Sequence, residues 1–139
     1  MSGESKRAER LMRAYLLFAA VLLVPIALNY GIAPAATLPR FLNIAVEGND
    51  QIQIFRALMC LYFATSAFWA IAAFKPDWQR PAVVFAVMFA FSLAIGRAIS
   101  LLLDGPASAL LDVYLGVEMA GGLLGVAVLA YASSHLTRR

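Results

Sequence analysis

The sequence predicts an all-α integral membrane protein: a four-helix transmembrane bundle with a short interfacial helix on its outer side. Of its 139 residues, 63% are hydrophobic and 14% are charged, whereas soluble domains have about 45–50% apolar and 25% charged residues. Four apolar stretches of about 20 residues are each long enough to cross a hydrocarbon core of about 30 Å. Such stretches must be helical in lipid, because every backbone polar group needs an internal partner. The length allows one domain, which excludes a repeat array or a large enzyme.

The first stretch begins after a basic tail. The predicted spans cover residues 11–30, 52–74, 82–103 and 109–131, between tails at residues 1–10 and 132–139. The basic tail and the Ala33-Pro34-Ala35 sequence are also typical of a signal peptide and its cleavage site. The apolar run is longer than a usual signal core, so we expect the first span to be retained.

The connection after the first span predicts the interfacial helix. Leu38, Phe41, Leu42 and Ala45 follow the i, i+3, i+4, i+7 spacing of an amphipathic helix, with Thr37 as its N-cap. A helix of this kind lies on the membrane surface or covers the end of the bundle.

The other boundaries carry helix start and stop signals. Asp50 is placed to cap the second span in a capping box with Gln53. Pro81 is suited to open the third span, and Ser108 to cap the fourth. Asp104-Gly105-Pro106 ends the third span. Such short connections predict that the last three spans are antiparallel neighbours.

The distribution of cations predicts the orientation. Eight Lys and Arg residues lie in the two tails, at the start of the first span and in the second connection, against Arg40 alone in the other connections. The positive-inside rule then places both termini in the cytoplasm. Arginine outnumbers lysine nine to two, which is typical of GC-rich bacterial genomes, so we expect a bacterial inner-membrane protein.

Charge and metal-ligand content exclude several functions. The net charge is +3, but the cations flank apolar runs instead of forming a patch, so the expected partner is the lipid bilayer and no nucleic acid. Cys60 and His135 are the single residues of their types. They cannot form a zinc site or a Cys–His catalytic pair. The sequence therefore predicts no metal site and no catalytic residues, and it indicates no particular cofactor.

Charged side chains within the spans are the candidate functional residues. Arg56, Arg97 and Glu118 lie in the second, third and fourth spans, and Asp104 and Asp112 lie at the outer ends of the last two. An ionised side chain at the centre of a membrane helix costs about 2.5–3.5 kcal/mol. Helical Cβ atoms lean toward the N-terminus, so Arg97 and Glu118 converge from antiparallel helices. We therefore predict an Arg97–Glu118 ion pair, with Arg56 nearby and closer to the outer surface.

Small residues share the faces that carry these charges. Ser100 lies on one helical stripe with Arg97 and Asp104. Gly96 belongs to a small-residue ridge on the third span, and Gly121 and Gly125 form a GxxxG motif on the fourth. Such residues predict close helix packing, within the chain or against a partner.

Three functions fit this pattern. The first is a non-enzymatic structural or accessory membrane protein, with a membrane protein partner or a second copy of the chain, in which the charges fix helix order. The second is binding or transport of a small anionic or lipid-like ligand at Arg56, Arg97 and Glu118. The third is a membrane enzyme acting on a lipid or quinone-like substrate, although these residues supply no nucleophile or metal.

The sequence also resembles a known family. The motifs are Ile54-Phe55-Arg56-Ala57-Leu58-Met59 before Leu61-Tyr62, then Gly96-Arg97-Ala98-Ile99-Ser100, Asp104-Gly105-Pro106 and Glu118. They are similar to those of domain-of-unknown-function family 4345, small bacterial four-helix membrane proteins. The resemblance covers residues 29–131, with Cys60 standing where the family pattern has glycine. It implies the four-helix architecture and brings no established activity.

Overall fold

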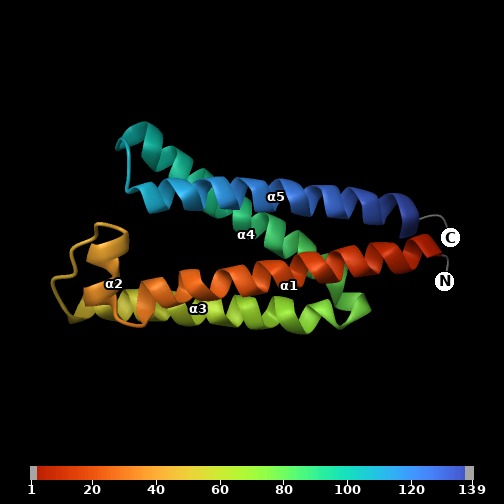
Figure 1. Cartoon of the computed structure of the whole chain (residues 1–139), viewed down its shortest axis with the longest axis horizontal. Coiled ribbons are helices and arrows are strands. Elements are labelled where there is room, and N and C mark those ends of the chain that lie inside the picture. Colours follow the sequence, from red (N-terminus) through yellow and green to blue (C-terminus); the bar gives the residue numbers. More distant parts are fainter. Residues whose placement is uncertain (1–2, 137–139) are drawn as a thin grey trace.

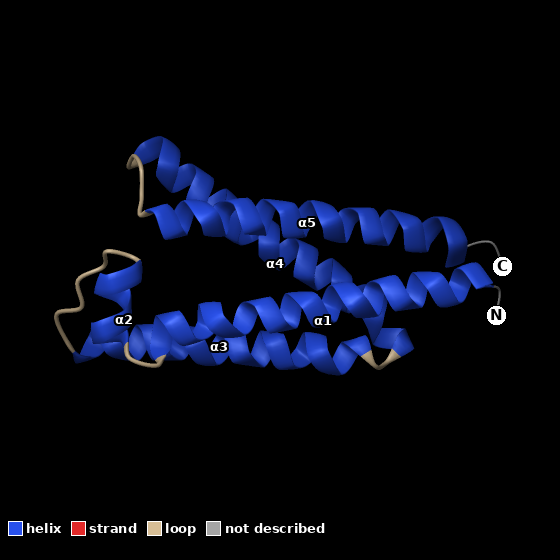
Figure 2. Ribbon diagram, viewed as in Figure 1, coloured by secondary structure: helices blue, strands red, loops and turns tan. Residues whose placement is uncertain are grey.

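A computed structural model describes residues 3–136, and these residues form helices joined by short loops, without a strand (Figures 1 and 2). The helices are α1 (Gly3–Gly31), α2 (Pro34–Phe41), α3 (Asn49–Ala73), α4 (Pro76–Leu103) and α5 (Ala109–Leu136). The four long helices are long and apolar enough to cross a membrane. The predicted all-α membrane fold is therefore confirmed. Arg138 and Arg139, which contribute to the predicted orientation, lie outside the described residues, as does the side chain of His135.

The long helices associate mainly as two pairs. α1 lies along α3, and α4 lies along α5, while α4 crosses from the end of α3 to the start of α5 (Figure 1). The described ends of α1 and α5 lie together at one end of the bundle, and α2 lies at the other. We call these the terminal end and the α2 end.

The predicted neighbours are only partly correct, because α3 packs more extensively on α1 than on α4. The tight turn after α3 holds α3 and α4 together at the terminal end only. Toward the α2 end the two pairs diverge (Figure 1). A short connection fixes proximity at one end of two helices, while side-chain packing sets their crossing angle.

The interfacial helix is confirmed, but its boundaries differ from the prediction. α2 is capped by Ala33, and Thr37 lies one turn inside, where its hydroxyl donates to the Ala33 carbonyl at 3.0 Å. Leu38 and Leu42 are buried against the bundle. Asn43, with a φ of 59°, ends the helical path, so Ala45 lies outside the helix.

Three further helix starts differ from the prediction. Gly48 is the N-cap of α3, so Asp50 lies in the first turn and caps nothing. Pro76 opens α4, which leaves Pro81 inside the helix. Ser108 precedes α5, and its carbonyl accepts the first backbone bonds, but its hydroxyl has no partner within the described residues.

Hydrogen bonds between helices link α1 to its neighbours. The Tyr15 hydroxyl donates to the Gly121 carbonyl of α5 at 3.0 Å. The Ser66 hydroxyl of α3 donates to the Ala20 carbonyl at 2.8 Å. These bonds hold α1 between α3 and α5, because a hydroxyl in the hydrocarbon core has no water as an alternative hydrogen-bond partner.

The three glycines predicted to give close packing differ in the space around them. A Cβ on Gly125 would overlap Tyr15 and Val87, so α5 meets α1 and α4 closely there. A Cβ on Gly96 or Gly121 would meet nothing within 4 Å. Close packing within the chain is therefore found at Gly125 and not at Gly96 or Gly121, and packing of these two glycines against a partner stays a prediction.

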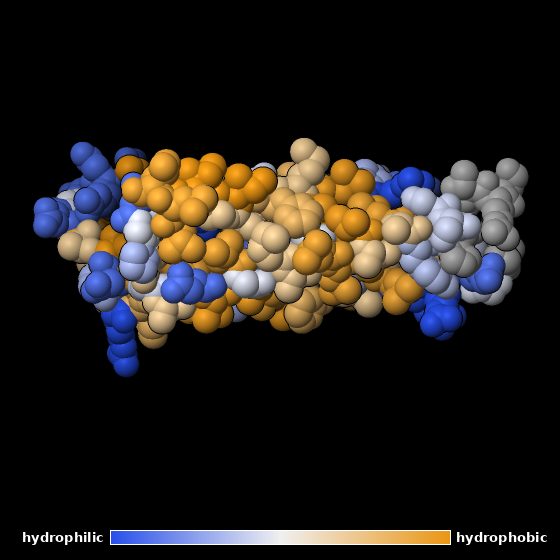
Figure 3. All heavy atoms as spheres, turned by 90° about the horizontal axis from the view of Figure 1, so that it is seen from above, coloured by the Kyte–Doolittle hydropathy of each residue, from blue (hydrophilic) through white to orange (hydrophobic). Residues whose placement is uncertain are grey.

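The surface has the distribution expected in a bilayer. Apolar residues form a broad band around the middle of the molecule on the face shown in Figure 3, and hydrophilic residues gather at both ends. Large apolar side chains such as Val21, Leu102 and Leu103 point outward. An apolar exterior of this extent fits a membrane environment.

Candidate functional site

The predicted ion pair is present between α4 and α5. The Arg97 Nε donates to Glu118 Oε1 at 3.0 Å and to Oε2 at 2.9 Å. The two side chains are 19% and 11% exposed, so the pair is largely withdrawn from the surface. Antiparallel α4 and α5 bring the two side chains toward each other, because each leans toward the N-terminus of its own helix.

Tyr114 connects the ion pair to α1. The Arg97 Cζ lies 5.5 Å from the centroid of the Tyr114 ring, within the range of a cation–π interaction. The Tyr114 hydroxyl accepts a hydrogen bond from Asn29 Nδ2 at 3.5 Å. The α4–α5 pair is thereby joined to α1 through a polar chain of contacts.

Two buried tyrosines complete this polar region. Tyr30 of α1 stacks on Phe55 with ring centroids 6.2 Å apart, and it meets Tyr62 of α3 edge-to-face at 5.9 Å. Both hydroxyls lie in the neighbourhood of the Arg97 guanidinium. We use the term polar cluster for these residues together: Asn29, Tyr30, Tyr62, Arg97, Tyr114 and Glu118.

Four members of the polar cluster were not among the predicted site residues: Asn29, Tyr30, Tyr62 and Tyr114. These side chains are polar but uncharged, and they lie inside or beside apolar spans, where charged residues give the stronger sequence signal. Their hydrogen-bonding groups within the apolar spans are the sequence signal that indicates them.

Arg56 is placed apart from the ion pair. It is exposed and lines a surface hollow formed by the first turns of α3, together with Asn49, Asp50, Ile52 and Gln53. Neither of the two cavities that Arg97 and Glu118 border includes Arg56. The divergence of α3 from α4 accounts for this separation.

The remaining predicted site residues lie at the α2 end of α4 and α5. The Ser100 hydroxyl donates to Asp104 Oδ2 at 2.8 Å, in an exposed position. Asp112 is exposed in the first turn of α5 and borders a cavity of about 210 Å³ with Gly96, Arg97 and Ser100. The structure therefore brings four predicted residues around one cavity and leaves Asp104 beside it.

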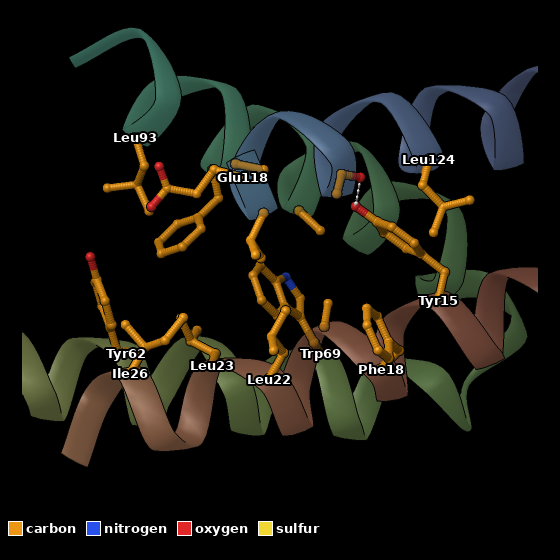
Figure 4. Close-up of a pocket in the computed structure, with 16 residues that line it drawn as sticks. Tyr15, Phe18, Leu22, Leu23, Ile26, Tyr62, Trp69, Leu93, Glu118 and Leu124 are labelled. Atoms are coloured by element: carbon orange, nitrogen blue, oxygen red, sulfur yellow. Dashed lines mark hydrogen bonds between the residues drawn. The ribbon is translucent and has the colours of Figure 1, made fainter. Parts of the chain in front are cut away.

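A second cavity lies on the other side of the ion pair. It measures about 80 Å³ and is bordered by all four long helices, mainly through apolar side chains (Figure 4). Its polar borders include Glu118, Tyr62 and Trp69. Arg97 borders one cavity and Glu118 the other, so the ion pair lies between the two spaces.

The chemistry available to the polar cluster is electrostatic. It holds one guanidinium, one carboxylate and three phenols. Across residues 3–136, no group of three or more His, Cys, Asp or Glu side chains is placed to hold a metal ion. The cluster can hold helices together, or donate and accept hydrogen bonds to a molecule beside it.

The fold and the site define a small multi-pass α-helical membrane protein with a neutralised ion pair among its long helices. The chain belongs to the family described as Domain of unknown function (DUF4345), whose model matches residues 11–129. The family resemblance of the sequence motifs is thus confirmed. No curated protein and no solved structure matches the chain.

Proposed function

We propose that the protein is a non-enzymatic structural or accessory protein of a bacterial inner membrane, in which the Arg97–Glu118 pair holds α4 against α5. The observation that carries this proposal is that the partner of the Arg97 guanidinium lies within the chain, at 2.9 Å. A charge neutralised in this way is suited to holding two helices together. An Arg side chain without a partner would be suited to attracting a ligand.

The same geometry argues against an anionic ligand at Arg56, Arg97 and Glu118. An anion that bound Arg97 would share its single positive charge with Glu118, leaving a net negative charge in an apolar region. Arg56 cannot assist, because it borders a separate hollow on α3.

The accessory role is supported by the outward faces of α4 and α5. Large apolar side chains are exposed along them, including Met88, Ile95 and Leu123. Such faces suit lipid and also suit helices of a membrane partner, which includes a second copy of this chain.

We further propose that both termini face the cytoplasm. Cationic side chains gather at the terminal end, where Arg7 lies over Tyr131, Arg13 over Phe74 and Lys75 over Trp78. Aromatic rings paired with cations are typical of the membrane interface, and an excess of Lys and Arg marks the cytoplasmic side.

Native mass spectrometry of protein extracted gently from its own membrane tests this function. Wild type is compared with Arg97→Met and with a control, Asp77→Asn, which changes an exposed carboxylate in the first turn of α4, the helix that carries Arg97. We expect a stoichiometric second protein or second copy with the wild type, and a less stable Arg97→Met protein without loss of any small molecule. A small molecule retained by the wild type and lost from Arg97→Met would instead establish a binding function. A wild-type protein found only as a bare monomer would contradict the accessory role.

A further inference from the structure

The cavity of about 80 Å³ contains a buried donor that the polar cluster does not use. Trp69 of α3 is 3% exposed and borders this cavity. Its indole Nε1 makes no hydrogen bond with any residue that the structure describes. Figure 4 shows the nitrogen turned away from α1 and α3, toward the middle of the space.

An indole N–H in this position is unusual. Buried Trp N–H groups normally have a hydrogen-bond partner, and burying a donor without one costs free energy. The Trp69 ring packs against Phe85 and Phe89, with centroids 6.3 Å and 5.4 Å away. These rings offer at most the weak acceptor of a π-face, so the N–H lacks an oxygen or nitrogen acceptor among the described residues.

The surroundings of the indole disfavour water as that acceptor. A buried water needs two to four polar partners, and the cavity wall near Trp69 is formed largely by apolar side chains such as Leu22, Leu23 and Phe89. The carboxylate of Glu118, at one end of the cavity, is bound to Arg97. An acceptor attached to an apolar body satisfies the N–H and fills the space at the same time.

The position of the cavity indicates a route from the bilayer. Phe18 of α1 and Leu124 of α5 border it, and they are 59% and 50% exposed. Both side chains therefore stand partly at the apolar outer surface. A molecule dissolved in the hydrocarbon core can reach the cavity between them without crossing a polar layer.

We propose that this cavity binds a neutral, membrane-soluble molecule whose carbonyl oxygen accepts a hydrogen bond from Trp69 Nε1. The ligand is uncharged because the ion pair beside the cavity is already neutral and the remaining wall is mostly apolar. The carbonyl belongs to a ketone, ester, amide or quinone group. This site is independent of Arg56 and of the accessory role proposed above.

The first test uses 2-nonanone and n-nonane, which share an apolar chain and differ in the carbonyl group. The protein is reconstituted in lipid nanodiscs as Trp78→Phe, which leaves Trp69 as the remaining one of two tryptophans. NMR then follows its single indole N–H signal. We expect 2-nonanone to shift this signal downfield in a saturable manner, and n-nonane to leave it almost unchanged. Equal responses to the two molecules, or no response to the ketone, would overturn the proposal.

A second test measures affinities with Trp69→Phe, which keeps an aromatic ring and removes the donor. We expect the preference for ketone over alkane to fall by roughly three- to tenfold, the range for one net hydrogen bond. Trp78→Phe, at the terminal end, should keep the full preference. An unchanged preference in folded Trp69→Phe would refute the assignment. If Trp69→Phe does not fold, the NMR result in Trp78→Phe decides alone.

Discussion

Neutralising Glu118 alone is expected to destabilise the protein more than neutralising Glu118 and Arg97 together. Two unit charges about 4 Å apart attract by about 4 kcal/mol at an effective dielectric constant of 20. The pair is 19% and 11% exposed, so water screens it only in part. Breaking a buried pair by removing one partner typically costs about 3–5 kcal/mol. We therefore expect Glu118→Gln to lower the free energy of unfolding by about 3 kcal/mol, because it leaves the Arg97 charge without a counter-ion.

The double variant Arg97→Met, Glu118→Gln should lose only about 1 kcal/mol, because no uncompensated charge remains. Unfolding is measured in lipid bicelles for wild type, both single variants and the double variant. The control Asp112→Asn alters an exposed carboxylate and should cost less than about 1 kcal/mol. If the loss in the double variant equals the sum of the two single losses within about 0.5 kcal/mol, the coupling is refuted, because independent sites are additive to that degree.

Three further changes test the packing and the membrane placement. Gly125→Val should destabilise by about 1–3 kcal/mol through overlap with neighbouring helices, whereas Gly96→Ala, which adds a methyl group to open space, should be neutral or slightly stabilising in the same unfolding assay. Tyr15→Phe should cost about 0.5–1.5 kcal/mol by removing one hydrogen bond, and an unchanged free energy of unfolding would show that this bond is not formed. Cys60 is exposed on the long helix α3, so in inside-out membrane vesicles it should resist a water-soluble maleimide that readily labels Ser134→Cys, and equal labelling would contradict the span.

The sequence was sufficient for the spans and for the ion pair. Both depend on local rules: apolar length fixes the spans, and the lean of helical side chains brings Arg97 and Glu118 together. Depth along an antiparallel helix pair is readable from residue number alone, at 1.5 Å per residue.

The separation of Arg56 from this pair depends on the rotation and tilt of whole helices. The position of Arg56 along its span correctly predicts that it lies near one end of the bundle. This position does not indicate which side of α3 faces α4. That side is set by tertiary contacts of α3, such as the hydrogen bond from the Ser66 hydroxyl to the Ala20 carbonyl of α1. For the same reason Gly121 was expected to face a neighbouring helix closely, although a Cβ at this position would meet open space.

The helix starts illustrate a different limit. Several residues near each boundary can cap a helix, and the preferred one depends on the path of the preceding loop. Gly48 therefore caps α3 and Pro76 opens α4, where Asp50 and Pro81 were expected. The Trp69 indole was equally beyond prediction, because a missing hydrogen-bond partner is a property of the assembled bundle.

Exchange of the two charges tests the structural role of the ion pair most directly. Folded protein extracted from membranes is quantified by size-exclusion chromatography for Arg97→Glu, for Glu118→Arg and for the double exchange. Each single exchange places two like charges beside each other, and we expect it to abolish most of the folded protein. The double exchange restores an opposite pair and should recover a large part of it. A double exchange no better than the single ones would contradict the claim that attraction between these residues holds α4 against α5.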